Sequence, residues 1–161
     1  MHKNLKPFSF MLAAIMLLLT ACKANITRNQ DGTLTLETTI TQQELQEVIT
    51  DSISDPLIKN VVVSLQPGYI IVSGERQRLN DAGKTDILTF RLDLRAGSGQ
   101  LVASVTNAQI DGKPIEQNRV DNWNQTIANR LSKLGRKNPN STLQSVSITT
   151  DAVTLTWNAS R

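Results

Sequence analysis

The most reactive side chains are rare in this chain of 161 residues, which contains one histidine, His2, and one cysteine, Cys22. Ser/His/Asp and Cys/His catalysis both require an imidazole, and zinc sites are normally built from several histidines and cysteines. A single cysteine also excludes an internal disulfide. The sequence therefore favours a protein that is not an enzyme and that holds no metal and no cofactor.

Three carboxylates close in sequence, Glu37, Glu44 and Glu47, are candidates for acid/base chemistry. Glu44 follows Thr41 by three positions, which is the spacing of a helix capping box, so a structural role explains it. Glu37 and Glu47 lie among polar residues. We assign no catalytic residue.

The N-terminal segment has the three-part layout of a secretory signal. Lys3 and Lys6 precede an apolar run from Phe8 to Leu19 that is broken only by Ser9. The uninterrupted apolar core, residues 11–19, is too short to span a bilayer as a helix. We therefore expect residues 1–21 to be a signal peptide that is removed, together with His2.

The sequence Leu19-Thr20-Ala21-Cys22 resembles a bacterial lipobox. The resemblance implies cleavage before Cys22, diacylglycerol attachment to its sulfur, and acylation of the new amino terminus, with palmitate as an expected acyl group. Two or more acyl chains hold a protein stably on a membrane. We expect a lipid-anchored protein on the extracytoplasmic side, in the periplasm or at the cell surface. The alternative is an ordinary exported protein with a chance cysteine at the cleavage site.

Charge and size limit the classes of function. Lys3 and Lys6 leave with the signal, so 15 of the 17 basic side chains remain against 14 acidic ones, a balance that argues against nucleic-acid binding. With 39% hydrophobic and 19% charged residues, the chain suits one modest globular domain. We expect a polar, lipidated tether over 22–32 and one domain over 33–161.

Hydrophobic periodicity predicts the elements of that domain. Apolar residues at every second position indicate strands, and apolar residues at steps of three or four indicate amphipathic helices. The helix after Thr41 should end at Asp55-Pro56, because the residue before proline avoids helical angles. The clearest alternation runs over 86–95. The expected order is a strand at 33–40, a helix at 42–54, a meander of strands at 57–66, 69–78, 86–95 and 100–110, a helix at 115–134, and a hairpin of 143–149 with 152–158.

This order predicts an α+β fold in which a long-stranded, curved antiparallel meander sheet packs on a long amphipathic helix, with a second, shorter helix. The acylated anchor, the meander, the Asp-Gly-Lys-Pro turn at 111–114, the long helix and the final hairpin together resemble small single-domain bacterial members of the tubular lipid-binding (TULIP) superfamily. The resemblance covers most of residues 40–158. It implies a groove between sheet and helix that takes up a lipid or other apolar ligand.

We therefore expect a tethered lipoprotein that binds or shuttles such a ligand between its curved sheet and its long helix. Aliphatic residues of medium size dominate this layer, which leaves room for a pocket, although amphipathic stripes are more often ordinary core. The residues predicted to line the ligand are Val48, Ile49, Leu88, Phe90, Leu92, Trp123, Ile127 and Leu131.

Two other functions remain open. One is an envelope structural or interaction module without a small ligand, whose apolar surface is covered by a second copy, as a homodimer, or by another envelope protein. The exposed strand edges of a meander that does not close favour it. The other is a lipid esterase, since some relatives in the TULIP superfamily are associated with phospholipase activity, although no residues here match such a site.

Two basic groups could meet lipid phosphates at a groove mouth. They also suit a solvated sheet face and a helix C-terminus, where cations are favourable. These groups are Arg76, Arg78, Arg91 and Arg95 on neighbouring strands, and Lys133, Arg136 and Lys137 at the end of the long helix.

Overall fold

The computed structural model describes residues 24–30, 32–81, 83–136 and 139–159. The expected signal peptide at 1–21, the predicted lipid-attachment residue Cys22 and the basic residue Lys137 lie outside these residues. The elements are β1 (Ala24–Arg28), β2 (Leu34–Thr41), α1 (Gln42–Ile53), β3 (Ile58–Gln66), β4 (Tyr69–Gln77), β5 (Thr85–Gly97), β6 (Gln100–Ile110), β7 (Lys113–Pro114), α2 (Gln117–Gly135), β8 (Ser141–Ile148) and β9 (Ala152–Ala159).

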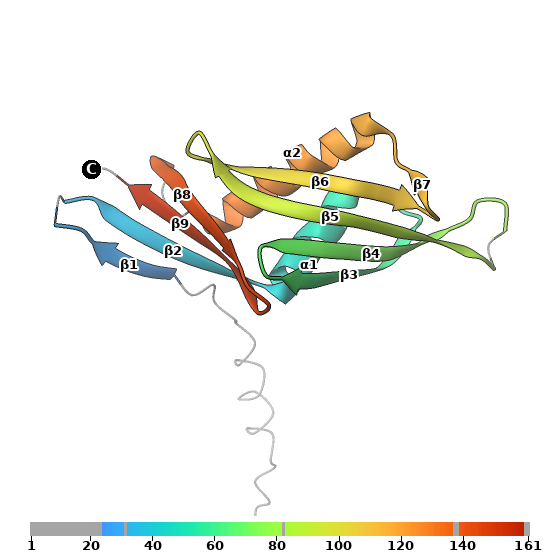
Figure 1. The fold of residues 1–161 in the computed structure, drawn as a ribbon, viewed down its shortest axis with the longest axis horizontal. Helices are drawn as coiled ribbons and strands as arrows, with labels where there is room; N and C mark the ends of the chain where they lie inside the picture. Colours follow the sequence, from blue (N-terminus) through green and yellow to red (C-terminus); the bar gives the residue numbers. More distant parts are fainter. Residues whose placement is uncertain (1–23, 31, 82, 137–138, 160–161) are drawn as a thin grey trace, which may run out of the picture.

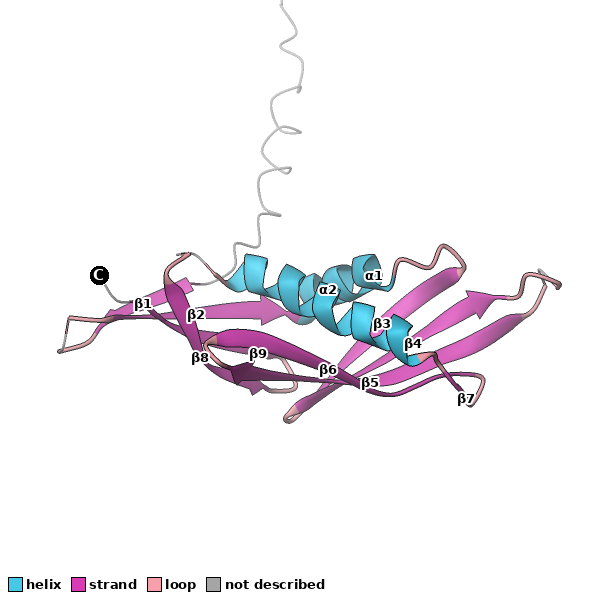
Figure 2. Ribbon diagram, turned by 90° about the horizontal axis from the view of Figure 1, so that it is seen from above, coloured by secondary structure: helices cyan, strands magenta, loops and turns pink. Residues whose placement is uncertain are grey.

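The α+β class and the antiparallel pairing are confirmed, but the strands form two sheets rather than one. The meander and β7 make one sheet, in the order β3-β4-β5-β6-β7, and the remaining strands make the other, in the order β1-β2-β9-β8. The two sheets lie side by side along the long axis of the molecule (Figure 1). Both helices lie on the same side of the sheets (Figure 2).

The sheets meet where two hairpin turns of the meander reach strand β8. The amide of Gly68 donates to the carbonyl of Ile148 at 3.0 Å, and the amide of Leu143 donates to the carbonyl of Gly99 at 2.8 Å. These are single hydrogen bonds at the two ends of β8 rather than a continuous ladder. The final hairpin therefore pairs with β2, which is far away in sequence, instead of extending the meander.

Helix α1 begins as the capping box predicts. The amide of Glu44 donates to Thr41 Oγ1 at 3.3 Å, and the amide of Thr41 donates to Glu44 Oε2 at 2.8 Å. The helix ends at Ile53, one residue earlier than expected, because Ser54 adopts the left-handed conformation with φ 51°. Asp55 is thereby left outside the helix, where its carboxylate can face other elements.

Helix α2 runs along both sheets and is held at its C-terminal end. Thr38 of β2, fully buried, donates from Oγ1 to the carbonyl of Gly135 at 2.8 Å. A Cβ at Gly135 would lie 2.5 Å from Leu155 Cδ1 and 3.3 Å from Trp157 Nε1, so only glycine lets the helix approach β9 this closely. The helix starts two residues later than predicted, after the segment 113–116.

Part of the segment expected to be a tether is strand β1. Residues 24–28 pair with β2 from Ala24 opposite Thr38 to Arg28 opposite Leu34. All five residues of β1 are exposed. An edge strand with no buried face has no hydrophobic alternation, so its sequence looks like that of a polar linker.

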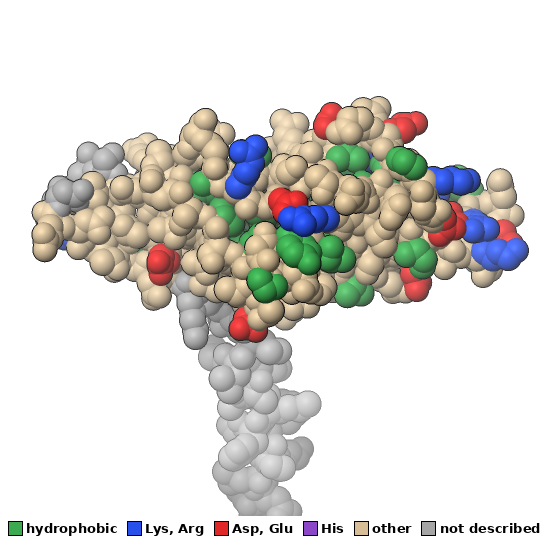
Figure 3. All heavy atoms as spheres, in the orientation of Figure 1, with side chains coloured by type: hydrophobic (Ala, Val, Ile, Leu, Met, Phe, Trp, Pro, Cys, Tyr) green, Lys and Arg blue, Asp and Glu red, His purple; other side chains and the backbone are tan. Residues whose placement is uncertain are grey.

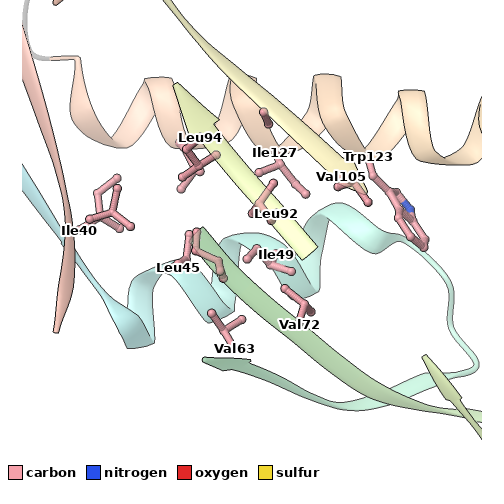
Figure 4. Close-up of a cluster of buried hydrophobic side chains, with 14 of the residues drawn as sticks. Ile40, Leu45, Ile49, Val63, Val72, Leu92, Leu94, Val105, Trp123 and Ile127 are labelled. Carbon is pink, nitrogen blue, oxygen red and sulfur yellow. The ribbon is translucent and has the colours of Figure 1, made fainter. Parts of the chain in front are cut away.

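The hydrophobic core fills the layer between the helices and the two sheets (Figure 4). Trp123 of α2 and Phe90 of β5 meet with ring centroids 5.5 Å apart, and Trp123 Nε1 donates to the carbonyl of Ile53 at 3.2 Å. Within the described ranges, no helix is both long enough and apolar enough to cross a membrane.

Candidate functional site

The eight residues predicted to line a ligand come together in one place, which is the core of the helix–sheet layer. Seven of them are at most 2% exposed, and Val48 is partly buried against the same cluster. Ile49, Leu92 and Ile127 point toward one another from α1, β5 and α2, and Trp123 lies at the edge of the same cluster (Figure 4). They pack as ordinary core, which is the alternative that their amphipathic pattern left open. The hollows described below are lined by other residues.

A hollow of about 590 Å³ opens at one end of this layer, between the meander and the first turn of α2. Basic and acidic side chains gather at this end of the molecule, around the β4–β5 hairpin and β7 (Figure 3). We call it the charged hollow, and it is lined by Arg76, Arg78, Asp86, Ile110, Asp111, Lys113, Pro114, Ile115, Glu116 and Arg119.

Strand alternation places three of these charged residues on the helix-facing side of the sheet. In β4, the even-numbered residues Ile70 and Val72 are buried on one face of the strand. Arg76 is on the same face, and Arg78, just beyond the strand end, continues the same alternation. In β5, Asp86 shares its parity with the buried Leu88. The charged hollow is therefore the polar end of the face whose other residues form the core.

The Asp-Gly turn between β6 and β7 forms the second wall of the charged hollow. Asp111 and Gly112 have φ values of 47° and 74°, as a two-residue type I′ hairpin requires. Ile87 and Asp111 exchange hydrogen bonds, since the Ile87 amide donates to Asp111 Oδ1 at 2.7 Å and the Asp111 amide donates to the Ile87 carbonyl at 2.9 Å. The turn thus places Lys113 opposite Ile110 of β6, at the edge of the sheet.

Arg78 joins the turn to the sheet. Its Nη2 lies 3.0 Å from Asp111 Oδ2, and its Nε donates to Asp86. The pKa of Asp111 lies below its ordinary value. The main cause is the hydrogen bond from the Ile87 amide, and side-chain hydrogen bonds with Asp86 and Arg78 add to it. The hydrogen bonds to Asp86 and Asp111 raise the pKa of Arg78. Arg78 and Asp111 are therefore both charged at neutral pH.

Asp55 lies beneath the charged hollow and ties three segments together. Its side chain is 10% exposed; Oδ2 lies 3.3 Å from Arg76 Nε and 3.8 Å from Arg119 Nη1, and Oδ1 accepts from the Leu57 amide at 3.0 Å. Asp55 follows α1, Arg76 is in β4 and Arg119 is in α2. One carboxylate therefore positions two guanidinium groups from different elements.

Lys113 and Glu116 are the two remaining charged groups of the charged hollow. Both are exposed, and no ion pair joins either one to another residue in the described part of the chain. Glu116 is the N-cap residue of α2, but its side chain makes no capping hydrogen bond. Both groups are therefore available to a ligand.

A second hollow lies on the other side of the 113–116 segment. It has a volume of about 790 Å³ and shares Pro114 and Ile115 with the charged hollow. No charged residue lines it, so we call it the neutral hollow; its other lining residues are Val105, Thr106, Asn107, Ala108, Gln109, Gln117 and Val120.

The basic residues singled out from the sequence are separated by the fold. Arg76 and Arg78 line the charged hollow, whereas Arg91 and Arg95 have the opposite parity in β5 and lie on the outer face of the sheet. Arg91 pairs with Asp93 and lies 4.3 Å over the Tyr69 ring. Lys133 and Arg136 line a different hollow, at the C-terminal end of α2.

The sequence did not indicate Asp55, Asp86, Lys113 or Glu116 as site residues. Each has an ordinary local explanation, in a turn, at a strand end or at a helix start. No group of three His, Cys, Asp or Glu that could hold a metal ion occurs among the residues that the structure describes. Comparison of the chain with protein-family models, with curated proteins and with solved structures gives no match.

Proposed function

We propose that this protein is a lipoprotein, tethered through acylated Cys22 on the extracytoplasmic side of a bacterial membrane, that binds or shuttles a lipid-like amphiphile. The charged hollow receives the head group. One observation carries the proposal: the guanidinium groups of Arg76, Arg78 and Arg119 and the ammonium group of Lys113 line one hollow together with apolar Ile110, Pro114 and Ile115. An anionic head group attached to an acyl chain has this combination of chemistry.

The arginines can bind a phosphate without releasing their carboxylates. A guanidinium group carries five N–H donors in a planar fork. Arg76 uses Nε toward Asp55, and Arg119 approaches the same carboxylate with Nη1. Donors on both groups thus remain for a second oxyanion, and charge-assisted hydrogen bonds of this kind are the strong ones.

The apolar part of the ligand needs a different place from the one that the sequence predicted, because the predicted lining residues are packed against one another. Pro114 and Ile115 separate the charged hollow from the neutral hollow and line both. An acyl chain attached to a bound head group can cross these two residues into the neutral hollow. Each of the two volumes, about 590 Å³ and about 790 Å³, falls within the size range of small-molecule sites.

A TULIP-like fold belongs to the same proposal. A long helix lies along one side of a long-stranded antiparallel meander, and the charged hollow is at the open end of the layer between them. The absence of histidine and of a free thiol in the chain after residue 22 supports a binding role rather than catalysis.

The test uses the full, lipidated chain in a neutral detergent and a short-chain phospholipid as the probe. Native mass spectrometry and a phosphorus NMR titration measure binding. We expect one phospholipid per chain, and binding at least about tenfold weaker in Lys113→Gln/Arg119→Gln, because a lost charge-assisted hydrogen bond costs about 1.5–3 kcal/mol.

The matched control is Lys59→Gln/Arg95→Gln, which removes the same charges from exposed positions outside the charged hollow and should bind like the unmodified chain. The proposal fails if the unmodified chain binds no phospholipid or if both double variants bind equally. Cys22→Ser tests the anchor separately, since it should move the protein from the membrane fraction to the soluble fraction.

A second candidate function, an envelope interaction module, is favoured by strand β1. It is an edge strand whose five residues are all exposed, and Ile26 at its centre is 70% exposed. Such an edge can pair with a strand of another chain, including a second copy. Sedimentation would then depend on protein concentration, and Ile26→Lys would abolish this dependence, whereas the equally apolar and exposed Leu79→Lys would not.

A further inference from the structure

The charges around the charged hollow are balanced. Its four basic groups are those of Arg76, Arg78, Lys113 and Arg119, and its lining includes three acidic groups, those of Asp86, Asp111 and Glu116. Asp55, which contacts Arg76 and Arg119 from beneath, is the fourth acid. A purely anionic ligand would therefore enter a site whose positive charges are already matched by carboxylates.

The existing ion pairs show which charges remain available. Asp55 engages Arg76 and Arg119, and Arg78 engages Asp86 and Asp111. These pairs also connect β4, β5, α2 and the β6–β7 turn, so breaking them to admit a ligand would disturb the wall of the charged hollow. Lys113 and Glu116 are the basic and the acidic group left over, three positions apart on the segment that carries Pro114 and Ile115.

We propose that the charged hollow selects an amphiphile with a zwitterionic head group, in which a phosphate lies next to a primary ammonium group. This inference rests on the proposed function. Lys113, helped by the remaining donors of Arg76 and Arg119, binds the phosphate, and Glu116 accepts hydrogen bonds from the ammonium group. Such a ligand adds one charge of each sign, so the balance of the charged hollow is preserved. A head group with phosphate alone adds one negative charge to this balance with no positive charge to offset it.

The test compares two short-chain phospholipids that share their acyl chains and differ in the head group, one with ethanolamine and one with glycerol. The protein is again the full lipidated chain in a neutral detergent, and phosphorus NMR titration measures both affinities. We expect the ethanolamine lipid to bind at least tenfold more tightly. In Glu116→Gln this preference should disappear, through weaker binding of the ethanolamine lipid and unchanged or tighter binding of the glycerol lipid.

Glu37→Gln is the matched control, since Glu37 is an exposed carboxylate of β2 in the other sheet, and it should keep the preference. Glu116 is exposed and its side chain caps nothing, so Glu116→Gln should fold normally, with an unchanged melting temperature. Equal affinities, or tighter binding of the glycerol lipid by the unmodified chain, overturn the zwitterion inference and leave the proposed function intact. Binding of neither lipid overturns the proposed function itself.

Discussion

Asp55 offers a direct test of how this fold is held together at the charged hollow. The substitution Asp55→Asn keeps the size of the side chain and the oxygen that accepts from the Leu57 amide at 3.0 Å. It removes the negative charge that faces Arg76 Nε at 3.3 Å and Arg119 Nη1 at 3.8 Å. The protein then retains two guanidinium groups that converge on a neutral amide.

The expected loss of stability follows from exposure. Asp55 is 10% exposed and Arg76 is 23% exposed, so this pair is only partly screened by water. A hydrogen bond to a charged group contributes about 1.5–3 kcal/mol, and discounting for the exposed part of Arg76 leaves about 1–2 kcal/mol. The contact to Arg119 adds little, because it is long and Arg119 is 44% exposed.

An ion pair between α1 and α2 supplies a control. Asp51 of α1 lies 3.2 Å from Arg130 of α2, but their side chains are 66% and 45% exposed. Exposed pairs of this kind contribute little, so Asp51→Asn should change the free energy of unfolding by less than about 0.5 kcal/mol. Both substitutions remove one carboxylate charge and differ mainly in burial.

Urea unfolding at neutral pH measures both variants. With a slope of about 1–3 kcal/mol per molar for a small protein, Asp55→Asn should lower the midpoint by roughly 0.3–2 M without changing the slope. Adding Arg76→Gln gives a double-mutant cycle whose coupling energy should exceed about 0.5 kcal/mol. Equal effects of Asp55→Asn and Asp51→Asn, or additivity of Asp55→Asn with Arg76→Gln, would refute this account of the charged hollow.

Three further predictions concern the core, the helix end and the acid response. Thr38→Val should cost about 1–3 kcal/mol in urea unfolding, because it leaves the carbonyl of Gly135 without its buried donor, while Thr39→Val on the same strand should change stability by less than about 0.5 kcal/mol. Trp123→Ala, at a site 2% exposed, should cost about 3–5 kcal/mol, and a loss below about 1 kcal/mol in thermal unfolding would contradict the packed core. The pKa of Asp111 is lower in the folded than in the unfolded chain. The ionised Asp111 carboxylate therefore stabilises the fold at pH values above its pKa in the unfolded chain, and this stabilisation is lost as the pH falls through its pKa in the folded chain. Asp111→Asn should therefore flatten the fall in stability below about pH 4, and an unchanged pH profile would contradict the lowered pKa.

Local elements were predictable because their causes are local. The capping box depends on two side chains three residues apart, and both of its hydrogen bonds form as expected at Thr41 and Glu44. The alternation over 86–95 identifies β5 and its buried face, because successive side chains of a strand point to opposite sides. Helix α2 was expected within two residues of its observed start, and differences of this size are ordinary at helix ends.

Strand pairing was less predictable because it depends on residues far apart. Leu36 pairs with Trp157, so the first long strand and the last one are neighbours, and this arrangement separates the final hairpin from the meander. Strand β1 was missed because all of its residues are exposed and no hydrophobic pattern marks it. An apolar stripe becomes core or pocket depending on how closely the elements that face it pack. The spacing of Ile127 and Leu131 identifies a buried helix face but does not specify that packing distance.

The sequence alone determined which reactive side chains this chain carries, namely one histidine and one cysteine, and the nearly balanced charge after residue 22. It also predicted the positions of most helices and strands. The tertiary structure alone decided which charges meet. Asp55 and Arg76 are separated by 21 positions, and Arg78 and Asp111 by 33. The physical reason is that capping and alternation act within a few residues, whereas the charged hollow arises only when sheet twist, helix packing and a two-residue turn bring distant side chains to one end of the core.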